Sequence, residues 1–106
     1  MAKVFVVSDA GHDYSSARDR GEITFLTEGK VNVFASDKLV KDIRYQLAGA
    51  TEHDYLILSG NQFAAAIAYA VLMELTGVVN TLIYSFNKQE YEVRSVRLAA
   101  VAGREG

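Results

Sequence analysis

Two short polar stretches carry the side chains best suited to chemistry, and the first is a turn. Ser59, Gly60 and Asn61 follow an apolar run and precede an almost wholly apolar segment, which is typical of a strand turning into a helix. Free backbone N–H groups and the helix dipole make such a turn attractive to anions. A hydroxyl, close backbone approach and an N-cap residue suit a phosphate, a ribose or a base edge. The alternative interpretation is that the turn simply caps the helix.

The second stretch follows the first apolar run of the chain. Ser8 ends that run, and His12, Asp13 and Tyr14 come shortly after it. Because the carboxyl ends of parallel strands share one edge of a sheet, we expect this loop to face the turn at Ser59. The expected ligand is a nucleotide or another phosphorylated small molecule. The predicted ligand-binding residues are Ser8, His12, Asp13, Tyr14, Ser59, Gly60 and Asn61.

The same loop allows an enzymatic alternative. Asp9, His12 and Asp13 supply two carboxylates and an imidazole in close succession. Such ligands suit Mg²⁺ or Mn²⁺ acting on phosphates, so the alternative function is a metal-dependent phosphoesterase or a nucleoside-processing enzyme. Loop aspartates more simply bond to their own backbone in turns, and on that interpretation no metal and no cofactor are expected.

Motifs with a fixed mechanism are missing from the chain. No Gly-x-Gly-x-x-Gly and no Gly-x-x-x-x-Gly-Lys-Ser/Thr pattern occurs, so neither a dinucleotide fingerprint nor a P-loop is predicted. Neither Ser8 nor Ser59 stands in a Gly-x-Ser-x-Gly setting, so no serine nucleophile is predicted. Whether any reaction is catalysed stays open.

Composition limits the classes of partner. The 11 basic and 13 acidic residues give a net charge of −2 without a basic block, so double-stranded nucleic acid is not an expected partner. The absence of cysteine excludes disulfides and fits the reducing cytoplasm of a bacterial or infected host cell. No run reaches the ~20 apolar residues of a membrane-spanning helix, so no membrane association is expected. We expect one domain over residues 1–98 and a flexible C-terminal tail at 99–106.

The spacing of apolar residues predicts a small Rossmann-like α/β sheet with a parallel centre. Apolar runs at residues 4–8, 55–58 and 79–84 are expected side by side as its central strands. Two main helices are expected, at residues 36–49 and at residues 61–76. Right-handed crossovers would connect the strands and bring their carboxyl ends to one edge.

Antiparallel hairpin strands are expected at the rims of this sheet. Residues 22–27 and 30–34 are predicted to pair around a glycine turn, a bend at that glycine being the alternative. Residues 90–98 are predicted to return as an edge strand, and a change of apolar parity along them predicts a bulge near residues 94–95. Residues 9–21 lack apolar periodicity and are predicted to form a long loop.

The second helix predicts self-association. From Phe63 to Met73 it has no polar face, whereas one sheet covers only about half of a helix's circumference. Its alanines would let two backbones approach closely, so we predict a homodimer through the helix at residues 61–76. The alternative is shielding by the helix at residues 36–49. A non-catalytic homodimeric interaction module is therefore the third function considered.

Several segments spread along the chain, as far as about Arg94, form a recognisable set. They are His12-Asp-Tyr-Ser15, Gly21-Glu22, Leu26-Thr-Glu-Gly-Lys-Val-Asn-Val-Phe34, Asp54-Tyr-Leu-Ile-Leu-Ser-Gly60 and Val79-Asn-Thr-Leu-Ile83. Together they resemble a group of short, uncharacterised proteins carried by bacteriophages and by some bacterial genomes. The resemblance implies a phage or prophage accessory role and no named activity, and it assigns no functional residues.

Overall fold

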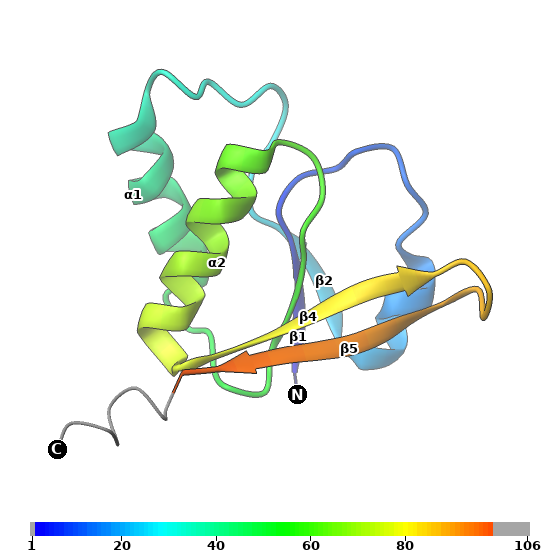
Figure 1. Ribbon diagram of the computed structural model, residues 1–106. Helices are drawn as coiled ribbons and strands as arrows, with labels where there is room; N and C mark the ends of the chain where they lie inside the picture. The colour runs from blue at the N-terminus through cyan, green and yellow to red at the C-terminus, as the bar shows by residue number, and fades with distance from the viewer. Residues whose placement is uncertain (1, 99–106) are drawn as a thin grey trace, which may run out of the picture.

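Five strands form one mixed sheet in the computed structural model, which describes residues 2–98 (Figure 1). The sheet order is β2-β1-β3-β4-β5, with all neighbours parallel except the antiparallel pair β4–β5. The predicted α/β fold is confirmed, and the three central apolar runs do lie side by side. The strands are β1 (Lys3–Val6), β2 (Glu22–Phe25), β3 (Tyr55–Ile57), β4 (Val78–Ser85) and β5 (Glu90–Arg97).

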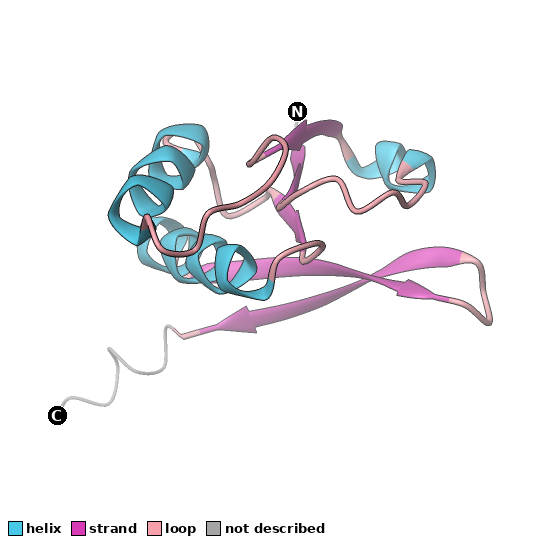
Figure 2. Ribbon diagram, turned by 90° about the horizontal axis from the view of Figure 1, so that it is seen from above, coloured by secondary structure: helices cyan, strands magenta, loops and turns pink. Residues whose placement is uncertain are grey.

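Helices cover both faces of the sheet. Helices α1 (Ser36–Leu47) and α2 (Gln62–Thr76) pack together on one face (Figure 2). The short 3-10 helix η1 (Ser15–Arg20) lies away from them and packs on the other face. Strand β1 is buried on both sides, because Phe5 packs into the core beneath α1 and α2 while its neighbours on β1 pack against the η1 side. The segment predicted as a loop at residues 9–21 therefore contains a helix, which buries Ala17.

The two long helices follow their predicted positions closely. Helix α1 buries Leu39, Ile43 and Leu47, whose spacing forms one apolar stripe. Helix α2 begins where the side-chain oxygen of its N-cap residue accepts a hydrogen bond from the Ala64 N–H at 3.0 Å. It ends at Gly77, which adopts the left-handed conformation with φ 78° that glycine allows.

The hairpin predicted at residues 22–34 is wrong. Strand β2 instead pairs in parallel with β1, and residues 30–34 form no strand. The backbone N–H groups of Leu26 and Thr27 extend this pairing by bonding to carbonyls at the end of β1. Because the backbone of a buried strand needs partners along both of its edges, β1 takes β2 as the neighbour opposite β3.

The bulge predicted near residues 94–95 is also wrong. The β4–β5 register runs without interruption from Val78 opposite Arg97 to Ser85 opposite Glu90. The change of apolar parity has a different cause, since Tyr91 packs into the core on the η1 side while Val96 is 45% exposed on the other face. Strand β5 is an edge strand, as predicted.

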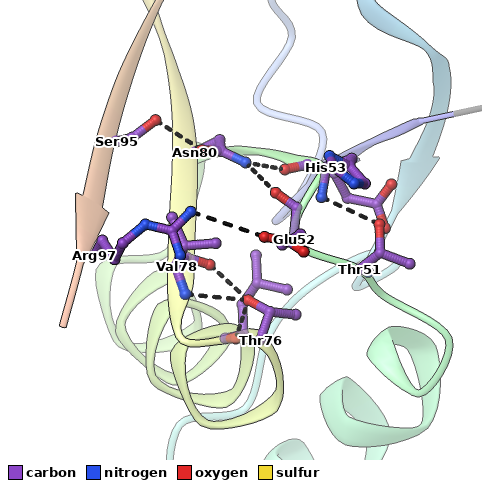
Figure 3. A network of polar contacts seen from close by, with 10 residues as sticks. Thr51, Glu52, His53, Thr76, Val78, Asn80, Ser95 and Arg97 are labelled. Atoms are coloured by element: carbon purple, nitrogen blue, oxygen red, sulfur yellow. Dashed lines mark hydrogen bonds and ion pairs between the residues drawn. The ribbon is translucent and has the colours of Figure 1, made fainter. Parts of the chain in front are cut away.

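A polar network ties the amino ends of the central strands together (Figure 3). Asp54, which is 5% exposed, accepts hydrogen bonds from the backbone N–H groups of Lys3 and Thr51, both at 2.8 Å. The Asn80 side-chain NH₂ group donates to the Asp54 backbone carbonyl, and the Asn80 side-chain oxygen accepts from the Ser95 hydroxyl. The network thereby fixes β1, β3, β4 and β5 at the edge opposite the predicted site.

Two further expectations concern the C-terminal tail and the membrane. The tail expected at residues 99–106 lies outside the described residues. Among residues 2–98, no helix has the length and apolar character needed to cross a membrane.

Candidate functional site

The connections that follow β1 and β3 leave the sheet toward opposite faces. The chain after β1 enters η1 on one face, and the chain after β3 enters α2 on the other. Because β1 and β3 are neighbours, their carboxyl ends border a crevice between diverging connections. Open α/β sheets hold their ligands at such a crevice.

A cavity of about 520 Å³ opens at this edge. Strand β3 ends at Ile57 while β4 runs on to Ser85, so the cavity lies beyond the end of β3 and along the flank of β4. The loop after β1 and the turn after β3 form one wall, and the β4–β5 hairpin forms the other. The lining residues are His12, Asp13, Tyr14, Ile57, Leu58, Ser59, Gly60, Thr81, Leu82, Ile83, Tyr84, Phe86 and Tyr91.

Most of the predicted site residues share this cavity. His12, Asp13 and Tyr14 reach it from the loop after β1, and Ser59 and Gly60 reach it from the turn after β3. The two remaining residues of the predicted set do not line it: these are Ser8 and Asn61.

Ser8 and Ser59 join the two loops by a reciprocal pair of hydrogen bonds. The Ser8 hydroxyl donates to the Ser59 carbonyl at 3.2 Å, and the Ser59 hydroxyl donates to the Ser8 carbonyl at 2.6 Å. Gly60 lies against this pair, and a Cβ there would stand 1.7 Å from the Ser8 Oγ. Both hydroxyl hydrogens are thus engaged inside the protein, so the pair sets the distance between the loops rather than offering free donors.

Asn61 serves the helix. Its side-chain oxygen accepts from the Ala64 N–H and its carbonyl accepts from the Ala65 N–H, each at 3.0 Å. These bonds satisfy two of the N–H groups that a helix leaves free at its start. The capping interpretation of the turn therefore holds for this residue.

In the part of the chain that the structure describes, Asp9, His12 and Asp13 do not gather as a set of metal ligands. The Asp9 carboxylate accepts from the Gly11 N–H at 2.9 Å, and the Asp13 carboxylate accepts from the Ser15 N–H at 2.9 Å. Over residues 2–98, no three histidine, aspartate or glutamate side chains gather as metal ligands. The two aspartates instead form the turns that loop aspartates commonly make.

Two titratable groups in the cavity have shifted pKa values. The Ser15 backbone N–H lowers the pKa of the Asp13 carboxyl below its usual 3.8, and the Ser15 hydroxyl and the Arg18 charge act in the same direction. Burial raises the pKa of the Tyr91 hydroxyl above its usual 10.0, and Tyr14, Tyr84 and, least, the Asp13 charge act in the same direction. At neutral pH the cavity thus holds an ionised carboxylate that accepts and a protonated hydroxyl that donates.

Aromatic rings make up much of the cavity wall. The Tyr84 ring meets the rings of Phe86 and Tyr91 edge to face, with centroids 5.2 Å and 5.1 Å apart. Across the cavity, His12 meets Tyr14 in the same way at 6.1 Å. Flat apolar surfaces of this kind favour a planar ligand.

The hairpin wall was not among the predicted site residues. The sequence patterns do not mark Tyr84, Phe86 or Tyr91 as site residues. A usable signal was the length of the apolar runs, since the run at residues 78–86 is about twice as long as the run at residues 55–58. A strand that is longer than its parallel neighbour leaves side chains without that neighbour beside them, beyond the neighbour's end.

Comparisons with curated proteins and with solved structures give no match. A match does occur with a family of phage proteins, the Phage Pam3 gp32-like protein family, over residues 2–98. The range covers nearly the whole chain and includes every residue that lines the edge cavity. The resemblance to phage-borne proteins is confirmed: the chain belongs to the Phage Pam3 gp32-like protein family.

Proposed function

We propose that this phage protein binds a nucleotide, or another phosphorylated small molecule with a planar ring, in the edge cavity. The observation that carries the proposal is the aromatic lining of a cavity that lies between the diverging connections of β1 and β3. Its volume falls within the roughly 300–1,000 Å³ usual for small-molecule sites. Nucleotides are abundant in the cytoplasm of a bacterial or infected cell, which is the location we propose.

Phe86 offers the sharpest test of this function. It lines the cavity and is 83% exposed, so Phe86→Ala removes a stacking surface with little effect on the fold. Stacking of one base on an aromatic ring contributes about 1–3 kcal/mol, so nucleotide affinity should fall about 5- to 150-fold. Titration calorimetry with purine and pyrimidine nucleotides measures the change.

Phe34 provides a matched control. It is 96% exposed but does not line the cavity, so Phe34→Ala should leave nucleotide affinity unchanged. Equal losses in both variants, or no binding of any nucleotide at millimolar concentration, would refute the proposal.

A second candidate function is assembly, and the surface of α2 favours it. Helix α1 covers one flank of α2, where Arg44 pairs with Glu74 at 2.6 Å. Ala66 and Ala70 remain exposed on α2, and Tyr69 between them is only partly buried. The shielding that α1 provides therefore leaves an apolar strip uncovered, and we propose that a second copy of the chain covers it through α2.

A further inference from the structure

The charges around the edge cavity disfavour phosphate inside it. Asp13 carries a negative charge at its rim, and no lysine or arginine stands among the lining residues. A phosphate in the cavity would therefore meet a like charge without a cation among the lining residues, since Arg18, whose charge acts on Asp13, does not line the cavity; the like charge weakens binding. The hydroxyl groups of Ser8 and Ser59 are already bonded to backbone carbonyls, so they add no free donors.

The polar groups that remain available suit the edge of a base. An ionised carboxylate only accepts hydrogen bonds and has about four acceptor positions, and on Asp13 the Ser15 N–H and hydroxyl leave about two of them for a ligand. Tyr91 lines the same cavity as Asp13, and its hydroxyl can donate a hydrogen bond. The cavity thus pairs strong acceptors with a neighbouring donor, beside rings that can stack on a base.

Resting on the proposed function, we infer that the cavity holds the base rather than the phosphate, and that Asp13 selects a ring edge with two adjacent N–H donors. Guanine presents such an edge, with its N1–H and its 2-amino group side by side and an acceptor oxygen next to them. Adenine places a ring acceptor beside its amino group, so a carboxylate facing it meets one unfavourable contact. The phosphate of a nucleotide then extends toward solvent and contributes little.

Calorimetric titration with guanosine, adenosine, xanthosine and guanosine monophosphate tests this selection. Guanosine should bind about tenfold or more tightly than adenosine, because the charged carboxylate accepts two hydrogen bonds from guanine and only one from adenine. Guanosine monophosphate should bind within about threefold of guanosine, since its phosphate lies outside the cavity.

The Asp13→Asn variant should change which base the cavity prefers. An amide replaces one accepting oxygen with a donating NH₂ group, which would face an N–H of guanine, so the guanosine affinity should fall about tenfold. Xanthosine, which has a carbonyl oxygen in place of the 2-amino group, should bind more tightly to the variant than to the unmodified protein. Asp9→Asn is the control, because Asp9 lies in the same loop and makes the same kind of turn without lining the cavity.

The outcomes separate this inference from the proposed function. If guanosine and adenosine bind equally, and Asp13→Asn alters neither while Phe86→Ala weakens both, the cavity binds bases without the selection inferred here. A guanosine monophosphate affinity far above that of guanosine would also overturn the inference, because it would assign the binding energy to the phosphate. Absence of binding by every nucleoside and nucleotide would overturn both.

Discussion

At the scale of single residues, Gly60 determines how closely the two loops of the site approach. Its backbone has φ 79°, and the space where a Cβ would stand is taken by the Ser8 hydroxyl. The residue therefore meets two separate demands, a left-handed backbone and the absence of a side chain.

Gly60→Ala should lower the free energy of unfolding through both demands. The left-handed backbone costs about 1–2 kcal/mol for alanine, and the overlap with Ser8 adds about 1–3 kcal/mol. Gly11→Ala isolates the first cost, because Gly11 has φ 83° and nothing lies within 4 Å of its Cβ position. Urea unfolding measures both variants, and an equal loss in the two would show that contact with Ser8 is unimportant.

Sequence reasoning reached part of the site at this scale. Asp13 and Tyr14 lie at the edge where the sequence places them, because polar residues after a buried strand collect at its carboxyl end; that they bind a ligand stays a prediction. The engagement of Ser59 with Ser8 was not predictable, because it depends on two loops far apart in sequence lying within hydrogen-bonding distance. Residue types show that a hydroxyl is present, whereas only the fold shows whether its hydrogen is free.

At the scale of elements, the network at Asp54 holds the strands in register at the edge away from the site. Its carboxylate accepts from two backbone N–H groups while nearly buried. Beside it, Asn80 links β3 to β4 and β5 (Figure 3). Removing a charged acceptor from buried backbone N–H groups lowers the free energy of unfolding, because those donors are left without a partner.

Asp54→Asn should therefore destabilise the fold by about 2 kcal/mol, because the amide replaces one acceptor with a donor facing N–H groups. Thermal and urea unfolding measure the loss. Glu52→Gln is the matched control, since Glu52 is exposed and its 3.8 Å ion pair with Arg97 contributes only about 0–1 kcal/mol. A loss no larger than that of the control would contradict the role given to Asp54.

The elements also show where sequence patterns fail. Helices α1 and α2 were predictable from an apolar stripe, a capping asparagine and a closing glycine. The pairing of β2 was not, because alternating residues such as those of 22–25 suit a parallel or an antiparallel neighbour equally well. The choice depends on which strand still has an unpaired edge, and that is a property of the assembled sheet.

At the scale of the whole molecule, the surface of α2 predicts a dimer. Light scattering should give a mass near twice the 11.6 kDa of one chain at micromolar concentration. The double change Ala66→Glu and Ala70→Glu should produce monomers with unchanged circular dichroism, because it places charges on the exposed strip.

Gln46→Glu provides the control, since it adds a charge to an exposed position of α1 away from that strip. It should leave the mass unchanged. A monomer for the unmodified protein, or a dimer that survives both glutamates, would rule out the helix as the interface.

The greater length of β4 over β3 has a mechanical consequence for the molecule. Beyond the end of β3 the β4–β5 hairpin projects as an arm from the body of the sheet (Figure 1). Tyr91 belongs to the same core cluster as Tyr14 and Ala17, so it anchors the arm on the η1 side. We expect a hairpin that is anchored at its base and packed near its middle to move most at its tip, where Phe86 borders the cavity. A ligand in contact with both the hairpin tip and the loops after β1 and β3 would therefore reduce the motion of the tip.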